Sequence, residues 1–198
     1  MYVTRHSHLT DAVFLDRLWE LYEFAYQGIA ELAVTRETLY RSEFDEVLAD
    51  PANRLWVVWD DNTPVGMCLV ATDIASTRYL SRAFFERHYP DHARRQAIHY
   101  IMWLVVHPAY EARGAIVRLA KEGLALEASE GVLLVFDTPQ INERGSGGLA
   151  EMMSRLSKAV MGGAPVHLLE TQRYYAVDFA PAANPAAAER TMSQRHGS

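Results

Sequence analysis

The chain of 198 residues is poor in several features that would mark a specialised class of protein. Its one cysteine, Cys68, excludes a disulfide framework within the chain and favours a reducing compartment. No apolar run approaches the ~20 residues that cross a bilayer, and the longest runs are Ile101–Val106 and Val132–Phe136. The start of the chain lacks the basic and apolar segments of an export signal. We therefore expect a soluble, cytoplasmic protein without a membrane partner.

Positive charge is also scarce. The 25 acidic residues outnumber the 19 basic ones, which gives a formal net charge of −6. A general nucleic-acid binder needs a basic face to displace counterions. We therefore expect no nucleic-acid partner.

Signatures of common metal and catalytic sites are missing. The eight histidines do not fall at the spacings of zinc ligands, so we expect no bound metal. The chain has no Gly-x-Ser-x-Gly elbow and no phosphate-binding P-loop. Gly145–Gly148 has no preceding strand and no following lysine, which favours a flexible lead into a helix.

The composition is that of a globular domain, with 49% hydrophobic and 22% charged residues. This length suits one domain with a substantial core. Residues 180–198 are rich in alanine and proline and have no periodic apolar face. We therefore expect a folded domain over residues 1–179 and a disordered tail over residues 180–198.

Apolar residues recur at three- and four-residue steps in two early stretches, which predicts two helices. The first follows Thr10-Asp11, and the second follows Thr35, a plausible N-cap, and ends before Pro51. Runs of β-branched and aromatic residues predict strands. These expected strands are Tyr2–His6 and a hairpin formed by Leu55–Trp59 and Val65–Thr72.

Residues 74–98 form a long insertion rich in aromatic residues, and we expect a helix over Tyr79–His88 that ends at Pro90. Later in the chain, apolar spacing predicts a helix from Leu149 to Val160. Two closing strands are expected over Val166–Leu169 and Arg173–Phe179. This order predicts a single α/β (α+β) domain with a mixed central sheet flanked by helices.

The most informative stretch runs from His99 to Asn142. An apolar strand, His99–His107, stops at Pro108, and a helix follows the small residues around Arg113 and Gly114. Small residues let backbone N–H groups approach an anion, and a helix N-terminus adds unpaired donors and partial positive charge. The pattern therefore predicts a pyrophosphate site, although an ordinary connection with a tight turn at Gly114 is an alternative.

The same residues resemble the acyl-CoA-binding half of a GNAT-type N-acyltransferase. The resemblance rests on Val106-His107-Pro108, the Arg113-Gly114-Ala115 loop, the helix Ile116–Ala128, the strand Val132–Asp137 and Asn142. It extends over roughly residues 2–179. Glu111 and Ala112 stand where the family usually has a basic residue or glutamine, and the second glycine of the loop is missing.

The resemblance implies acetyl-CoA or another acyl-CoA as cofactor. It places the cofactor's phosphates on the backbone of Arg113–Ile116 and assigns a backbone N–H of Val105 or Val106 to the oxyanion. Asn142 would bind the pantetheine arm, or alternatively cap the next helix. The insertion over residues 74–98 would form a lid or one wall of the acceptor pocket.

Candidates for proton transfer are less clearly marked. His99, His107, His167 and Glu170 could each relay a proton, and Glu170 ends an apolar strand pattern. The family's usual tyrosine acid is absent between Asn142 and Gly163. Tyr174 and Tyr175 follow on the last expected strand, where alternation would direct only one of them into the cleft.

We therefore predict an enzyme that moves an acetyl or longer acyl group from a CoA or carrier-protein thioester to an amine. One alternative is an enzyme similar to N-acyl amino acid or acyl-homoserine-lactone synthases. A basic surface for an acyl-carrier protein would then include Arg82, Arg87, Arg94 and Arg95. Another alternative is a non-catalytic GNAT-like binding or regulatory protein. Partners are a small-molecule amine acceptor or a carrier protein, and we allow for a homodimer.

Overall fold

The computed structural model describes residues 1–28, 31–34, 38–143 and 148–177. Contacts divide the chain into two units, residues 1–167 and residues 168–198, and each is considered by itself. The predicted tail over residues 180–198 and the predicted boundary at residue 179 lie outside the described residues. All the helices and strands described below belong to the first unit.

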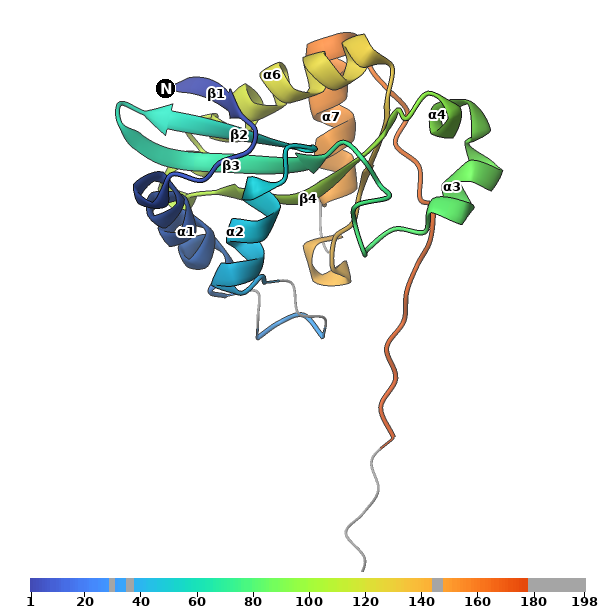
Figure 1. Cartoon of the computed structure of the whole chain (residues 1–198), viewed down its shortest axis with the longest axis horizontal. Coiled ribbons are helices and arrows are strands. Elements are labelled where there is room, and N and C mark those ends of the chain that lie inside the picture. Colours follow the sequence, from blue (N-terminus) through green and yellow to red (C-terminus); the bar gives the residue numbers. More distant parts are fainter. Residues whose placement is uncertain (29–30, 35–37, 144–147, 178–198) are drawn as a thin grey trace, which may run out of the picture. The chain divides into compact units, whose positions relative to one another are not determined.

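A five-stranded mixed sheet, in the order β1-β2-β3-β4-β5, forms the centre of the first unit (Figure 1). Its first three pairings are antiparallel, whereas β5 lies parallel to β4. The strands are β1 Tyr2–His6, β2 Asn53–Asp60, β3 Thr63–Ala71, β4 Ile98–Val106 and β5 Leu133–Phe136. The predicted fold class, the first strand and the hairpin are therefore confirmed. The strands predicted over His99–His107 and Val132–Asp137 are also confirmed, as β4 and β5.

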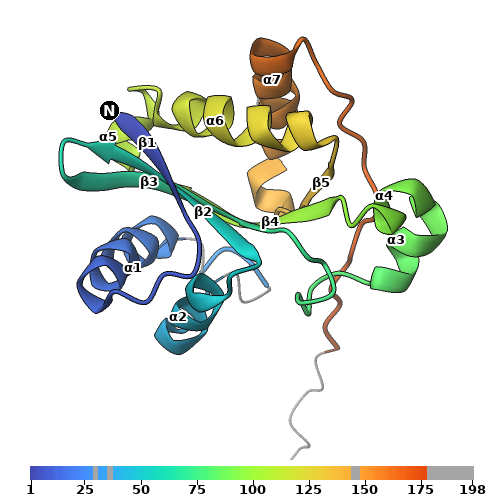
Figure 2. The same cartoon turned by 45° about the horizontal axis from the view of Figure 1, so that its top comes forward.

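Helices cover both faces of the sheet. In Figure 2, α1 and α2 lie on one face, and α6 lies across the other face near α7. The insertion forms a helical extension at the start of β4. The helices are α1 Ala12–Tyr26, α2 Arg41–Ala49, α3 Arg82–His88, α4 Pro90–Arg94, α5 Pro108–Glu111, α6 Ala115–Glu130 and α7 Leu149–Met161, with a 3₁₀ turn, η1, at Gln140–Glu143.

Two apolar cores hold these layers together. On the α1 and α2 face, Leu18, Tyr22 and Phe44 pack against Trp103 of β4. On the α6 face, Leu119 packs with residues of β2, β3 and β4. Strand alternation sends successive side chains to opposite faces, so β4 contributes to both cores and fixes the position of everything attached to it.

Helix ends follow the chemistry of their terminal residues. Asp11 caps α1, because its carboxylate accepts a hydrogen bond from Phe14 N at 2.8 Å. Gly131 and Gly162 end α6 and α7 in the left-handed conformation, with φ of 63° and 78°. The predicted helix starting near Thr10-Asp11 and the stop near Gly162 are thus confirmed.

Other boundaries differ from the predictions. Thr35, the expected cap of the second helix, lies outside the described residues, and α2 begins at Arg41 after Tyr40. Pro90 does not simply end the insertion's helix, because it also occupies the first turn of α4. Proline is suited to that position, since its fixed φ is helical and a first-turn N–H needs no acceptor.

The two closing strands are wrong for the described residues. Residues 163–177 are neither helix nor strand, and Leu168, Tyr175 and Val177 are strongly exposed. β-branched and aromatic residues favour strands because their side chains fit a pleated, half-buried surface. A strand also needs a neighbouring strand with which to form backbone hydrogen bonds. The β-branched and aromatic residues of this exposed segment therefore do not form a strand.

Candidate active site

The sheet opens where β5 ends. β5 pairs with β4 only from Ile98↔Leu133 to Ile101↔Phe136, whereas β4 continues to Val106 and remains paired with β3 on its other edge. Among the described residues, the Met102–Val106 edge therefore has no strand partner on the β5 side. Backbone groups on such an edge are free to bind a ligand. We call this opening the β4–β5 fork.

A β-bulge lies at the fork. Leu69 of β3 pairs with Trp103, and the next residue, Val70, pairs with Ile101, so Met102 is an extra residue in β4. Met102 and Trp103 both pack against the α1 and α2 core. A bulge changes the direction of side chains and often lies beside an active site. The sequence gives no signal for its position.

The predicted anion loop has the expected local geometry. Gly114 has φ +80° and directly precedes α6, a conformation that favours glycine. The N–H of Arg118 bonds to the carbonyl of Gly114, which leaves the earlier first-turn N–H groups, those of Ala115, Ile116 and Val117, without i→i−4 acceptors inside the helix. The short helix α5, which the sequence analysis missed, fills the space between β4 and this loop.

The side chain of Arg113 has partners of its own. Its NH1 lies 3.4 Å from Asp60 Oδ2, and its guanidinium lies 4.6 Å from the ring centroid of Tyr110. The Arg113 side chain is 54% exposed, and a pair of that kind contributes at most about 1 kcal/mol. To contact a phosphate as predicted, Arg113 would therefore have to break only a weak ion pair with Asp60.

A tyrosine–carboxylate pair lies where β5 stops. Tyr100 is buried, and its hydroxyl donates a hydrogen bond of 2.6 Å to Asp137 Oδ1, the residue after β5. Asp137 is exposed, and the ring of Tyr79 from the insertion lies 6.2 Å from that of Tyr100. From the sequence, Asp137 was interpreted only as the end of a strand. A carboxylate directly after an apolar strand was the signal that could have identified it.

His99 lies in a buried charged cluster. Its Nδ1 is 2.5 Å from Glu127 Oε2, and Arg54 NH1 lies 3.2 Å from Glu127 Oε1 and 2.9 Å from Glu130 Oε2. Possible ligand atoms of His99, Glu127 and Glu130 lie within 4.8 Å of one another, but Arg54 already supplies positive charge to both carboxylates. The geometry supports a structural role for His99, which joins β4 to α6.

The other expected proton carriers in the first unit also have partners. The ring of His107 stacks on Phe24, with centroids 4.9 Å apart. His167 Nε2 lies 2.9 Å from the hydroxyl of Tyr89. Such contacts are compatible with a positioning role as well as with proton transfer.

Asn142 lies in η1 and is exposed. It does not cap the next helix, because α7 begins after Gly148 and the carboxylate of Glu143 accepts the hydrogen bond from Ala150 N, at 3.2 Å. The capping alternative for Asn142 is therefore wrong, and the pantetheine contact stays a prediction.

Glu170, Tyr174 and Tyr175 belong to the second unit, where they are exposed and outside any strand. The strand alternation that was expected to separate the two tyrosines is absent, so it no longer chooses between them. Their roles remain predictions.

Most of the expected basic surface for a carrier protein is already paired. Arg82 lies 2.7 Å from Glu86, and Arg94 lies 2.9 Å from Asp91. Arg95 donates to the carbonyl of Gly131 at 2.8 Å. The carboxylates offset the charge of Arg82 and Arg94, whereas Arg95 keeps its charge because its acceptor is a neutral carbonyl.

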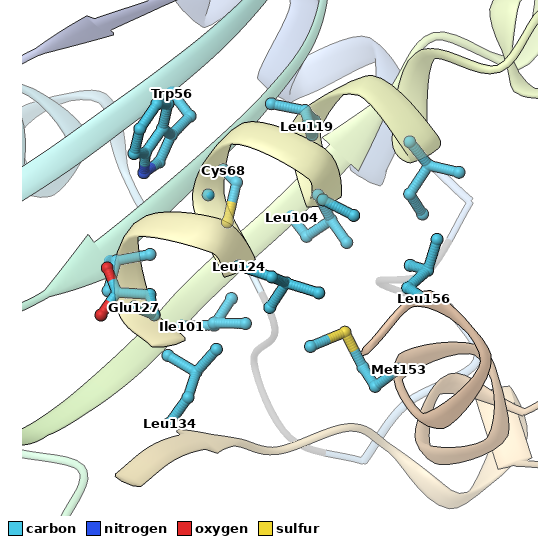
Figure 3. Close-up of a pocket in the computed structure, with 14 residues that line it drawn as sticks. Trp56, Cys68, Ile101, Leu104, Leu119, Leu124, Glu127, Leu134, Met153 and Leu156 are labelled. Carbon is cyan, nitrogen blue, oxygen red and sulfur yellow. The ribbon is translucent and has the colours of Figure 1, made fainter. Parts of the chain in front are cut away.

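Cys68 is not a candidate nucleophile. Burial and, to a smaller extent, the nearby carboxylate of Glu127 raise the pKa of its thiol to about 12. Cys68 lies among the residues that line a pocket between the sheet, α6 and α7 (Figure 3). The thiol therefore stays protonated near neutral pH.

Comparison with known proteins agrees with this architecture. Residues 15–144 match the model of the acetyltransferase (GNAT) family. No match was found among curated proteins. None of the helices in the described ranges has the length and apolar character needed to cross a membrane.

Two solved structures illustrate the likeness. A GCN5-related N-acetyltransferase from Ralstonia eutropha JMP134 is 17% identical with a TM-score of 0.52, over 86% of this chain and 97% of that one. An aminoglycoside acetyltransferase from an uncultured soil metagenomic sample, in complex with trehalose, is 11% identical with a TM-score of 0.50, over 89% of this chain and 95% of that one. At these identities the likeness shows the fold. The family match and the mixed sheet together show that this chain is an enzyme of the GNAT acetyltransferase family.

Proposed function

We propose that the protein transfers an acyl group from acyl-CoA to a small-molecule amine, with Asp137 as the general base. The observation that carries this proposal is the β4–β5 fork, because it combines three features. These are an unpaired edge of β4, the N-terminus of α6 and an exposed carboxylate fixed by Tyr100.

Residues of the first unit fit an acyl-CoA. The first-turn N–H groups of Ala115 and Ile116, next to Gly114, would bind its phosphates. The N–H of His107 bonds to the carbonyl of Val65 on β3, and successive N–H groups of a strand point to opposite edges. Of the two expected oxyanion donors, Val105 and Val106, only Val106 therefore has its N–H on the free edge of β4, where it would donate to the carbonyl oxygen as negative charge develops on it. Acyl-CoA supplies an activated carbonyl, so that a C–N bond to the amine forms, the C–S bond breaks and CoA leaves as its thiol.

Asp137 would take the proton that the amine loses. A general base has to reach the reacting group directly or through one water, and Asp137 is exposed at the fork. The Tyr100 hydroxyl holds one carboxylate oxygen at 2.6 Å, which leaves the other oxygen available to the substrate. Glu170 and His99 remain alternative candidates for this role, although His99 is buried against Glu127.

Tyr174 and Tyr175 stay the candidates for the acid that protonates the departing thiolate, since a phenol hydroxyl can donate a proton. Asn142 is proposed to hydrogen-bond the pantetheine arm. The location, which we propose to be cytoplasmic, rests on the single reduced cysteine.

The acceptor is proposed to be a small molecule rather than a carrier-bound partner. Three of the four arginines expected to bind an acidic carrier protein already have partners. The structurally similar aminoglycoside acetyltransferase, whose name refers to a small molecule, supports the same class.

Amine-dependent release of CoA thiol from acetyl-CoA tests this function, with a panel of amino sugars, amino acids and simple alkyl amines. Asp137→Asn should lower kcat/KM by at least about 100-fold, the typical contribution of a general base. Asp61→Asn is the matched control, because it makes the same chemical change in an exposed turn whose φ of 51° asparagine tolerates. Equal activity of the wild type and Asp137→Asn would remove Asp137 from the mechanism.

A further inference from the structure

Two residues from different elements hold the guanidinium of Arg113, the residue before Gly114. Asp60, at the end of β2, has its Oδ2 3.4 Å from Arg113 NH1. The ring centroid of Tyr110, in α5, lies 4.6 Å from the guanidinium carbon. A carboxylate oxygen therefore occupies a donor with which the arginine would otherwise bind a phosphate.

The backbone of the loop has hydrogen bonds that do not involve this ion pair. The N–H of Arg113 bonds to the carbonyl of Tyr110 at 3.1 Å, and the N–H of Gly114 bonds to the carbonyl of Glu111 at 3.3 Å. Gly114 then supplies the left-handed residue that begins α6. Loss of the Asp60 carboxylate should therefore free the Arg113 side chain and leave the loop in place.

The ion pair is suited to exchange with a ligand. Its N···O distance of 3.4 Å is longer than the ~2.7–2.9 Å of a strong charge-assisted hydrogen bond. The side chain of Asp60 is 26% exposed and that of Arg113 is more exposed still, so solvent weakens their attraction. A phosphate group offers two oxygens to the planar guanidinium and can replace this single carboxylate contact.

The exchange would take place beside the proposed phosphate site. Arg113 is separated only by Gly114 from the first turn of α6, whose N–H groups are the proposed phosphate donors. The ring of Tyr110 keeps the guanidinium close to this turn when Asp60 releases it, because a cation–π contact does not require the carboxylate. The arginine can therefore change its anionic partner without leaving the loop.

We propose that Asp60 is an internal competitor of the cofactor, and that it holds Arg113 in the free protein until a phosphate group of acyl-CoA takes its place. The inference rests on the proposed function and adds to it a residue that limits cofactor affinity. Asp60 acts through Arg113 and does not touch the reacting atoms. The affinity that Arg113 contributes is thus offset by the loss of its pair with Asp60.

Calorimetric titration with CoA tests this proposal on the wild type, on Asp60→Asn and on a matched control, Asp61→Asn. Asp61 is exposed in the turn that follows Asp60, and asparagine tolerates its φ of 51°. Asp60→Asn should tighten CoA binding by about 2-fold to 5-fold, the range of an exposed ion pair. Asp61→Asn should change it by clearly less. All proteins need the same N-terminus, because the amino group of Met1 lies 4.0 Å from Asp60 Oδ1.

A double-mutant cycle separates competition for Arg113 from a general effect of charge. Arg113→Gln should weaken CoA binding. Asp60→Asn added to it should give no gain beyond that of the Asp61→Asn control, since no guanidinium remains to be released. If Asp60→Asn does not fold, Asp60→Ala replaces it in both comparisons, because it removes the same carboxylate.

Unchanged or weaker CoA binding in a folded Asp60 variant would overturn the inference, because the pair would then support the cofactor site instead of competing with it. The same gain with and without Arg113 would also overturn it. Either result leaves the proposed function intact, whereas folded wild-type protein that does not bind CoA would refute the function itself.

Discussion

The buried cluster of Arg54, His99 and Glu127 predicts a large difference between two glutamates on the same helix. Glu127 and Glu130 both pair with Arg54, but the side chain of Glu127 is 4% exposed and that of Glu130 is 37% exposed. Glu127→Ala removes the carboxylate that bonds to His99 Nδ1 and one of the two carboxylates on Arg54. Loss of one member of a buried ionic group costs about 3–5 kcal/mol, and we expect the lower value because Arg54 keeps Glu130.

A loss of about 3 kcal/mol lowers the Tm of a domain of this size by roughly 6–12 °C. Glu130→Ala should cost at most about 1 kcal/mol, or less than about 4 °C. Thermal denaturation followed by circular dichroism measures both. Equal shifts for the two variants would refute the assignment of the cluster to the core, and so would a stable Glu127→Ala protein.

The same variants test the role of His99. If His99 is structural, the folded fraction of Glu127→Ala should turn over acetyl-CoA within a few-fold of the wild type at a temperature well below its Tm. A loss of 100-fold or more in fully folded protein would instead support His99 as a catalytic base that Glu127 orients.

Three other residues, Cys68, Tyr100 and Gly114, give specific expectations. Cys68 should react with iodoacetamide at pH 8 at least 100-fold more slowly in the native protein than in urea, since a pKa of about 12 leaves roughly one thiolate in 10⁴; comparable rates by mass spectrometry would contradict its burial. Because this pKa is raised on folding, the associated stability is complete below about pH 9 and falls as the pH rises towards 12, and Cys68→Ala should flatten that fall in denaturant titrations. Tyr100→Phe should lower kcat by about 5-fold to 10-fold without altering CoA affinity, because Asp137 loses one orienting hydrogen bond; unchanged kinetics would show that the bond does not matter. Gly114→Val should weaken CoA binding by about 10-fold in calorimetry, since a β-branched residue resists φ +80°, and a folded variant with wild-type affinity would remove the loop from the site.

The sequence predicted the elements whose pattern is local. The periodicity of α6, the glycine before it and the apolar run of β4 all express short-range geometry, and they sufficed to predict the left-handed turn at Gly114 that begins α6. The family resemblance rested on the same short-range pattern.

The remaining features depend on contacts between distant parts of the chain. Nothing near Met102 marks a bulge, because the register shift arises from pairing with β3. Asp137 became a candidate only when β5 was found to end beside Tyr100. His99 was proposed as a base because it lies at a strand end and a histidine can relay a proton near neutral pH, whereas the structure shows it buried and bonded to Glu127, 28 residues later.

The prediction of two strands after Val166 was wrong for the same reason, because strand formation depends on contacts with distant residues. Their composition favoured β-structure, but composition does not supply a neighbouring strand. The described residues 163–177 therefore remain irregular.

Direct calorimetric titration of the purified protein with CoA and acetyl-CoA tests the central claim, that the β4–β5 fork and the start of α6 bind an acyl-CoA. We predict saturable binding with one site per chain, and weaker binding at higher salt because the phosphates contribute charge to the interaction. Absence of binding at millimolar CoA, in protein shown to be folded by circular dichroism, would contradict the account.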